Sequence, residues 1–209
     1  MIIDCISDIH GYFPKLQGGD LLLIAGDLTA RDEPYQFEEF KKWLQKQNYK
    51  KKVLIAGNHD NFLAHLENPH EYFEEATYLS DSGTEFEGLK IWGSPWTKNF
   101  PGQNPLCKAF GLDLSTQMLE KFLLIPQDID ILITHSPPLG ILDNTRRARV
   151  GCPNLGNQVQ KMQKLKLHLF GHIHEGYGME EGALGTKFVN ASFVNEFYEP
   201  INAPTRIIL

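Results

Sequence analysis

The chain begins with Met1-Ile2-Ile3-Asp4-Cys5-Ile6, a mostly apolar run that breaks at once into Ser7-Asp8-Ile9-His10-Gly11. Later segments repeat this arrangement: Leu21–Ala25 before Gly26-Asp27, Lys52–Ala56 before Gly57-Asn58-His59-Asp60, Ile129–Ile133 before Thr134-His135, and Leu165–Phe170 before Gly171-His172-Ile173-His174. Short, nearly continuous apolar runs are typical of strands that are covered on both faces, as in α/β sheets. The sequence therefore predicts an α/β fold in which several strands end in polar residues.

Helical patterns lie between these runs. Phe37, Phe40, Trp43 and Leu44 recur at spacings of three and four within residues 34–48, which predicts an amphipathic helix. Further helices are expected at 115–124, with Ser115 as the N-cap, and at 154–165, and further strands at 89–93, 187–194 and 205–209. Residues 93–112 are rich in Gly, Pro and aromatic residues and are expected to form a long loop. No linker or block of charge divides the chain, so we expect one domain over residues 1–209.

Composition narrows the class of protein. A hydrophobic fraction of 42% in 209 residues is enough to bury a full core. The formal net charge of −6 disfavours broad electrostatic contact with extended nucleic acid or an anionic membrane, so neither is an expected partner. Cys5, Cys107 and Cys152 form no C-x-x-C pair, which argues against a disulfide framework and a thiolate zinc site. With no long apolar run and no basic leader, we expect a cytoplasmic protein.

The polar residues that follow the strands suggest a ligand site. In open α/β sheets, ligands bind where the carboxyl ends of neighbouring strands meet. That edge would collect Asp8, His10, Asp27, Asn58, His59, His135, His172 and His174. Carboxylate, imidazole and amide ligands suit borderline or hard divalent metals. His172 and His174 would project the same way if the backbone stays extended, whereas His65 and His70 are expected to be solvated and His168 to be structural.

The same motifs resemble those of the calcineurin-like metallophosphoesterase superfamily, from the first strand to about residue 175. Longer strings resemble the small MPPED-type (class III) phosphodiesterases within it: Gly93–Thr97, Thr134–Leu139, Arg149–Cys152 and His172–Gly178. The resemblance implies an α/β fold of four layers, a sandwich of two mixed β-sheets flanked by helices, with two divalent metal ions at one edge. Mn²⁺ is the metal we expect, with Fe, Zn, Ni and Mg as alternatives.

The resemblance also implies a role for each site residue. By motif position, Asp8, His10 and His174 would hold the first metal, Asn58, His135 and His172 would hold the second, and Asp27 would bridge both. Asn58 and His59 would bind substrate, and His59 would be the catalytic residue that protonates the leaving oxygen. The partner of His59 stays open, because the direction of Asp60 cannot be read from the sequence. Phosphoprotein phosphatases have a second Asp three residues after the bridging one; Ala30 stands here instead, which disfavours that activity.

The implied function is hydrolysis of phosphodiester bonds, with small nucleotides such as cyclic nucleotides as substrates, by attack of a metal-bridging hydroxide. The alternatives are a nucleotide-binding regulator with little turnover, or a phosphomonoesterase or nuclease on the same scaffold. Two sets of residues have two explanations each. Trp96, Phe100 and Phe110 would either stack on a base or pin the long loop, and Arg146, Arg147 and Arg149 would either contact a phosphate or lie in a solvated turn. The oligomeric state is left open.

Overall fold

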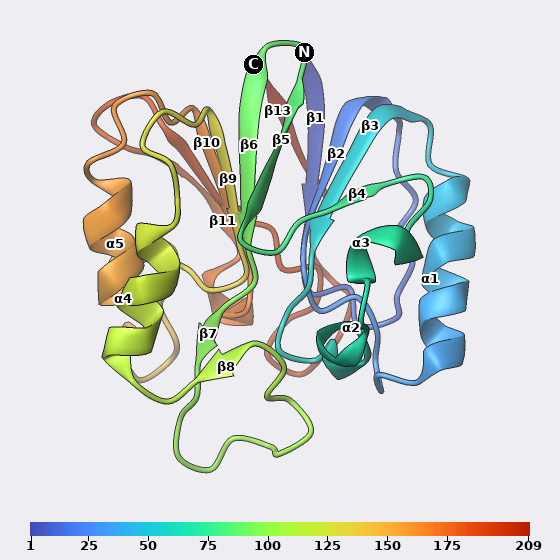
Figure 1. The fold of residues 1–209 in the computed structure, drawn as a ribbon, viewed down its shortest axis with the longest axis horizontal. Helices are drawn as coiled ribbons and strands as arrows, with labels where there is room; N and C mark the ends of the chain where they lie inside the picture. Colours follow the sequence, from blue (N-terminus) through green and yellow to red (C-terminus); the bar gives the residue numbers. More distant parts are fainter.

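The computed structural model describes residues 1–209 and places two β-sheets face to face, with helices covering the outer face of each (Figure 1). The first sheet has the order β13-β1-β2-β3-β4, with β1 Ile2–Ile6, β2 Gly19–Ala25, β3 Tyr49–Ile55, β4 Thr77–Tyr78 and β13 Thr205–Ile208. The second has the order β11-β12-β10-β9-β6-β5, with β5 Ser82–Phe86, β6 Leu89–Ser94, β9 Ile131–Thr134, β10 Leu167–Phe170, β11 Gly178–Glu181 and β12 Lys187–Asn190. The predicted fold, two mixed sheets flanked by helices, is confirmed.

The helices divide between the two outer layers. Beside the first sheet lie α1 (Pro34–Gln45), α2 (Asn61–His65) and α3 (Pro69–Tyr72), and beside the second lie α4 (Ser115–Leu123) and α5 (Pro153–Val159) (Figure 1). The predicted stripe of α1 is buried against the first sheet. None of the helices combines the length and the apolar character that crossing a membrane requires.

The central strands are buried on both faces, which explains why their apolar residues do not alternate with polar ones. In β2, Leu21, Leu23 and Ala25 pack into the core between the sheets, whereas Leu22 and Ile24 pack into the core beneath α1. A strand with both faces in a core gains burial energy from every side chain, at about 25 cal/mol per Å² of apolar surface. The continuous runs of the sequence are therefore the strands of a layered fold.

Both sheets present the carboxyl ends of their parallel strands at one edge. In the first sheet β2 is parallel to β1 and to β3, and in the second β9 is parallel to β6 and to β10. A parallel bridge between Ser7, after β1, and Ser192, after β12, joins the two sheets at this edge. It is the lower edge in Figure 1, opposite the two chain termini. Loops from both sheets therefore meet there.

Some local expectations were wrong. Helix α5 ends at Val159, although Met162 and Leu165 are still buried in the turns that follow. Ser115 is the first residue of α4 rather than its N-cap, and the Leu114 N–H donates to Gln117 Oε1 at 3.1 Å. The Ser115 hydroxyl instead accepts from Asn154. The long loop contains the short pair β7 (Thr97–Lys98) and β8 (Gly111–Leu112).

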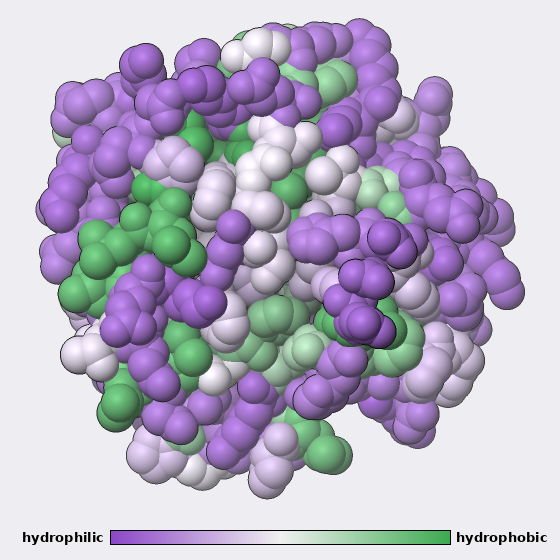
Figure 2. All heavy atoms as spheres, viewed as in Figure 1, coloured by the Kyte–Doolittle hydropathy of each residue, from purple (hydrophilic) through white to green (hydrophobic).

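The outer surface is largely hydrophilic, as Figure 2 shows for one face. The broadest apolar patch on that face lies on the side where Figure 1 draws α4, whose Leu119 and Leu123 are exposed. Scattered exposed apolar side chains are normal for a folded protein. The residues that carry chemistry lie instead at the edge where the loops meet.

Candidate metal centre

The loops at this edge have an uncommon backbone conformation. Asp8, His10, Asp27 and His172 have φ values of 49°, 43°, 54° and 68°. Residues other than glycine seldom adopt this left-handed backbone conformation. Each such strained residue costs about 1–3 kcal/mol of folding free energy, and residues of this kind cluster at functional sites. Gly26, at φ 92°, fits only without a side chain, because an added Cβ would lie 2.6 Å from the backbone nitrogen of Gly57. The fold thus holds four polar residues in strained positions at one edge.

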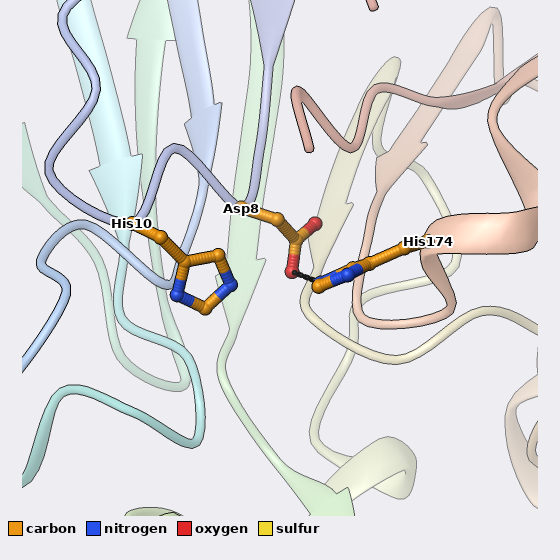
Figure 3. Close-up of side chains that lie close together, drawn as sticks. All are labelled: Asp8, His10 and His174. Atoms are coloured by element: carbon orange, nitrogen blue, oxygen red, sulfur yellow. Dashed lines mark ion pairs between the residues drawn. The ribbon is translucent and has the colours of Figure 1, made fainter. Parts of the chain in front are cut away.

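Asp8, His10 and His174 form a first group, in which the possible ligand atoms lie within 4.8 Å of one another (Figure 3). His174 Nδ1 donates to the Asn195 carbonyl at 3.0 Å, so its Nε2 faces Asp8 Oδ1 at 3.4 Å. His10 Nε2 is buried and has no hydrogen-bond partner. A buried nitrogen without a partner beside a carboxylate fits a divalent cation, which would satisfy both.

A second group joins Asp8 and Asp27 to His135. His135 Nδ1 donates to the Ala25 carbonyl at 2.7 Å, which turns Nε2 toward Asp27 Oδ1 at 3.3 Å. The amide oxygen of Asn58 lies 3.0 Å from the same Nε2. Asn58 Nδ2 donates to the Cys107 carbonyl, and this fixes which end of the amide faces the group. Backbone acceptors that orient metal-ligating histidines in this way are typical of metal sites.

The two histidines of the Gly171-His172-Ile173-His174 motif diverge. A shared direction was expected only for an extended backbone, and this condition is not met, because His172 has a left-handed backbone and His174 begins the 3₁₀ helix η1 (His174–Gly176). The ring of His172 lies 5.1 Å from that of His135, and the ring of His174 lies 5.4 Å from that of His10. Each imidazole therefore lies beside a different group, with His172 at the margin of the second.

His59 lies in a third group with His10 and Asp27, and its Nε2 is 4.0 Å from Asp27 Oδ2. Its partner is Cys107, whose Sγ lies 3.5 Å from His59 Nδ1. Burial raises the pKa of the Cys107 thiol, so the thiol stays protonated at neutral pH and can donate to Nδ1. That arrangement leaves the imidazole proton on Nε2, on the side of the carboxylates.

Asp60 turns away from His59. Its Oδ2 accepts the N–H groups of Asp27 and Gly57 at 2.9 and 2.7 Å, and its Oδ1 accepts the N–H of Leu28 at 3.0 Å. One buried carboxylate thus ties the loop after β2 to the loop after β3. Asp60 holds the loops that carry Asp27, Asn58 and His59 and takes no place among the candidate ligands.

The protonation states of the candidate ligands differ in the metal-free protein. Burial lowers the pKa of His10 to about 4 and that of His172 to about 3, so both imidazoles are neutral at pH 7. Burial opposes the charged form of His135 too, but Asp27 and Asp8 outweigh it and raise the pKa of His135 to about 9. The pKa of His174 is also raised, because Asp8 outweighs burial. The facing histidines hold the pKa values of Asp8 and Asp27 below their usual range despite burial.

Metal binding should therefore release protons. In the metal-free protein, His135 (pKa about 9) is protonated at pH 7 and must lose its proton to coordinate. We expect the affinity for Mn²⁺ to rise between pH 6 and pH 9, by up to about tenfold per pH unit for each proton released. Calorimetry in buffers of different ionisation enthalpy measures the released protons. Affinity that does not change with pH would contradict this protonation pattern.

The same shift sets a stability trend for the metal-free protein. The folded pKa of His135 lies above its ordinary value of 6.5, so its contribution to stability is full below pH 6.5 and is lost as the pH rises toward 9. Bound metal should remove this trend, because a coordinated imidazole no longer titrates in that range.

Several supporting residues have no signal in the sequence. The Ser192 hydroxyl lies 2.8 Å from Asp8 Oδ2, and the His172 N–H donates to both oxygens of that carboxylate. Tyr198 and Cys107 line a cavity of about 340 Å³ that also exposes Asp27. These residues come from loops far from the motifs in sequence, so only the fold brings them to the site.

The structure separates the aromatic residues of the long loop and shows the partners of two of the three arginines. Trp96 donates to Asp81 Oδ2 at 2.7 Å and packs on Phe110, so these two rings pin the long loop, whereas Phe100 lines the cavity. Arg146 pairs with Glu196 and Arg149 with Asp143. His65 and His70 are exposed, as expected. His168 is buried within β10, with Nε2 2.9 Å from Thr134 Oγ1, but its Nδ1 has no hydrogen-bond partner.

Comparison with known proteins identifies the family. The model of the calcineurin-like phosphoesterase family matches residues 1–176. The chain is 39% identical to human metallophosphoesterase domain-containing protein 1, over 98% of this chain and 70% of that protein. The chain therefore belongs to the calcineurin-like phosphoesterase family, whose members use divalent metals, and this membership supports phosphoester hydrolysis.

More distant proteins resemble the chain as well. It is 24% identical to a probable cyclic nucleotide phosphodiesterase of Synechococcus, over 78% of this chain and 61% of that protein. A crystal structure of a putative 5′-nucleotidase from Staphylococcus aureus superposes with a TM-score of 0.52 at 10% identity, over 99% of this chain and 53% of that one. The second likeness concerns the fold alone.

Proposed function

We propose that this protein is a metal-dependent phosphodiesterase that uses two divalent ions, Mn²⁺ foremost, to hydrolyse small phosphodiesters such as cyclic nucleotides. The observation that carries the proposal is the overlap of the ligand groups. Asp8 belongs to both the group with His10 and His174 and the group with Asp27 and His135. Asp27 also belongs to the group with His10 and His59, so it lies beside candidate ligands of both ions. Shared carboxylates at one cavity support two neighbouring cation positions, which is the arrangement that phosphoryl transfer requires.

Each candidate ligand has a proposed role that follows from its position. Asp8, His10 and His174 would hold one ion, and Asn58, His135 and His172 would hold the other, with Asp27 between them. When bound, the two ions would neutralise phosphoryl charge and make water available as a nucleophile near neutral pH. The ionised carboxylates supply −2 against the +4 of two divalent ions, so a net positive charge remains to attract a phosphate anion.

His59 would donate the proton to the leaving oxygen. Its side chain lines the cavity and lies beside Asp27, and its Nδ1 lies 3.5 Å from the Cys107 sulfur. To act as the acid, the ring would be the imidazolium, with Nδ1–H facing the Cys107 sulfur and Nε2–H on the cavity side. Transfer of the Nε2 proton to the leaving alkoxide would then leave a neutral imidazole. Asn58 lines the same cavity and would contact the substrate.

His59→Ala should separate acid catalysis from metal binding. With Mn²⁺, the wild-type protein should hydrolyse both bis-p-nitrophenyl phosphate and 3′,5′-cyclic AMP. The variant should lose about 10²–10⁴-fold in turnover of the cyclic nucleotide, whose alkoxide needs a proton, and much less with the nitrophenolate, which leaves without one. Metal content should stay near wild type. His65→Ala, at an exposed helical position, is the matched control.

Other results of these assays would support one of the alternative functions. A metal-loaded wild type that is inert toward diesters and cyclic nucleotides would contradict the proposal. Tight retention of an unhydrolysed nucleotide would identify a regulator instead, and faster turnover of p-nitrophenyl phosphate than of the diester would identify a phosphomonoesterase.

A further inference from the structure

Tyr198 lies over the candidate metal centre, although it stands outside the residues that match the family model. The centroid of its ring is 4.9 Å from that of His10 and 5.3 Å from that of His174, both in edge-to-face contact. The ring of His59 lies 6.2 Å away. The phenol ring thus packs on the candidate ligands His10 and His174 and lines the same cavity as His59, the proposed proton donor.

The chain holds this ring in place at an energetic cost. Tyr198 has a φ of 62°, a left-handed conformation that is a genuine outlier for a bulky aromatic residue. Asn195 maintains it: its carbonyl accepts the Tyr198 N–H, and its side-chain oxygen accepts the N–H groups of Phe197 and Glu199, all at 2.9 Å. The same carbonyl accepts His174 Nδ1. One turn therefore positions both a candidate ligand and the ring above it.

Burial does not explain the strain. Tyr198 remains 47% exposed, so its ring adds little to a core, yet it lines the cavity of about 340 Å³. Phe100, which is 55% exposed, lines the same cavity from the long loop. Two exposed rings in a mostly polar cavity offer flat apolar surface next to the place where a phosphate would bind. Aromatic faces of this kind bind planar rings by stacking, with little preference among them.

We propose that Tyr198 is a substrate-binding residue whose ring contacts the leaving group, and that the preferred leaving groups carry an aromatic or heterocyclic ring. This inference rests on the proposed function and deepens it by naming the substrate class. Stacking of this kind contributes about 5- to 150-fold in affinity per ring. Alkyl phosphodiesters should then be poorer substrates, because they bring the same phosphate without the ring.

Unreactive ligands test the contact without turnover. Phenylphosphonate and methylphosphonate carry the same anionic group and differ in the ring. The Mn²⁺-loaded wild type should bind phenylphosphonate about 5- to 150-fold more tightly than methylphosphonate. Tyr198→Ala should remove this preference and leave the affinity for methylphosphonate unchanged, whereas Tyr198→Phe should keep the preference. Phe197→Ala, on the same turn but outside the cavity lining, should behave as wild type.

A stability measurement separates this role from a structural one. Tyr198→Gly relieves the left-handed strain, so its melting temperature should equal or exceed that of wild type while the ring preference is lost. A lower melting temperature together with an unchanged preference would overturn the inference. Equal binding of both phosphonates by wild type would also overturn it and leave the proposed function standing. Failure to bind either phosphonate would count against both.

Discussion

Asp27→Asn should lower diester hydrolysis by a factor on the order of 10³ and reduce the bound metal below two ions per chain. The substitution keeps the shape of the side chain and removes one negative charge. That charge lies among three histidines, with His135 Nε2 at 3.3 Å, His10 Nε2 at 3.7 Å and His59 Nε2 at 4.0 Å. A unit charge about 4 Å from a cation contributes about 4 kcal/mol at an effective dielectric constant of 20, which corresponds to roughly three orders of magnitude.

The matched control for this change lies on β2, the strand that precedes Asp27. Asp20, at the opposite end of β2, pairs with Lys50 at 2.7 Å and is far from the cavity in the fold. Asp20→Asn should leave both metal content and activity unchanged, because surface ion pairs contribute little. An Asp27→Asn protein that keeps two ions and wild-type activity would show that Asp27 does not link the two positions. Metal analysis and initial rates on the same preparations provide both readouts.

Asp60→Ala should lower the free energy of unfolding by about 3–5 kcal/mol, the largest stability effect that we expect from a single site residue. It removes the acceptor for three buried N–H groups, those of Asp27, Leu28 and Gly57. Each buried donor that loses its partner costs about 1–3 kcal/mol, and partial relaxation reduces the sum. Metal affinity should also fall about 10- to 100-fold, because the loops that present Asp27 and Asn58 lose their tie.

Two further variants separate these effects. Asp60→Asn retains one oxygen acceptor and should give an intermediate loss of stability and of metal affinity. Asp130→Ala removes a carboxylate that accepts a single backbone N–H, from Lys90, at a less buried position, so the loss should be smaller. Denaturant unfolding of the metal-free proteins measures the stabilities. If Asp60→Ala proved as stable as Asp130→Ala, the three hydrogen bonds would not hold the loops together.

Strands covered on both faces were predictable from the sequence, because every side chain of such a strand is buried and most of its residues are therefore apolar. For this reason the apolar run Leu21–Ala25 lies within β2, and the run Lys52–Ala56 covers the second half of β3 and the residue that follows it. Strands β5 and β11 lie at the two opposite edges of the second sheet, with mixed or exposed side chains, and carry no such pattern. Edge strands depend on pairing with a neighbour rather than on burial, so composition gave no indication of them.

The candidate ligands were predictable from motifs, but their surroundings were not. Asp8, Asp27 and His135 each follow a strand of the parallel arrangement, and the carboxyl ends of such strands meet at one edge. Cys107 and Tyr198 reach the site from segments without a motif, 48 residues from His59 and 24 residues from His174. The direction of Asp60 and the left-handed backbone of His172 depend on contacts between loops. Such contacts exist only once the chain has folded.

The central claim is that two cations bind side by side at this edge. A crystal structure of the Mn²⁺-loaded protein, with anomalous data, tests it most directly. We predict two anomalous peaks about 3.5–4 Å apart, one beside Asp8, His10 and His174 and one beside Asp27 and His135. A single peak, or peaks distant from these side chains, would contradict the account.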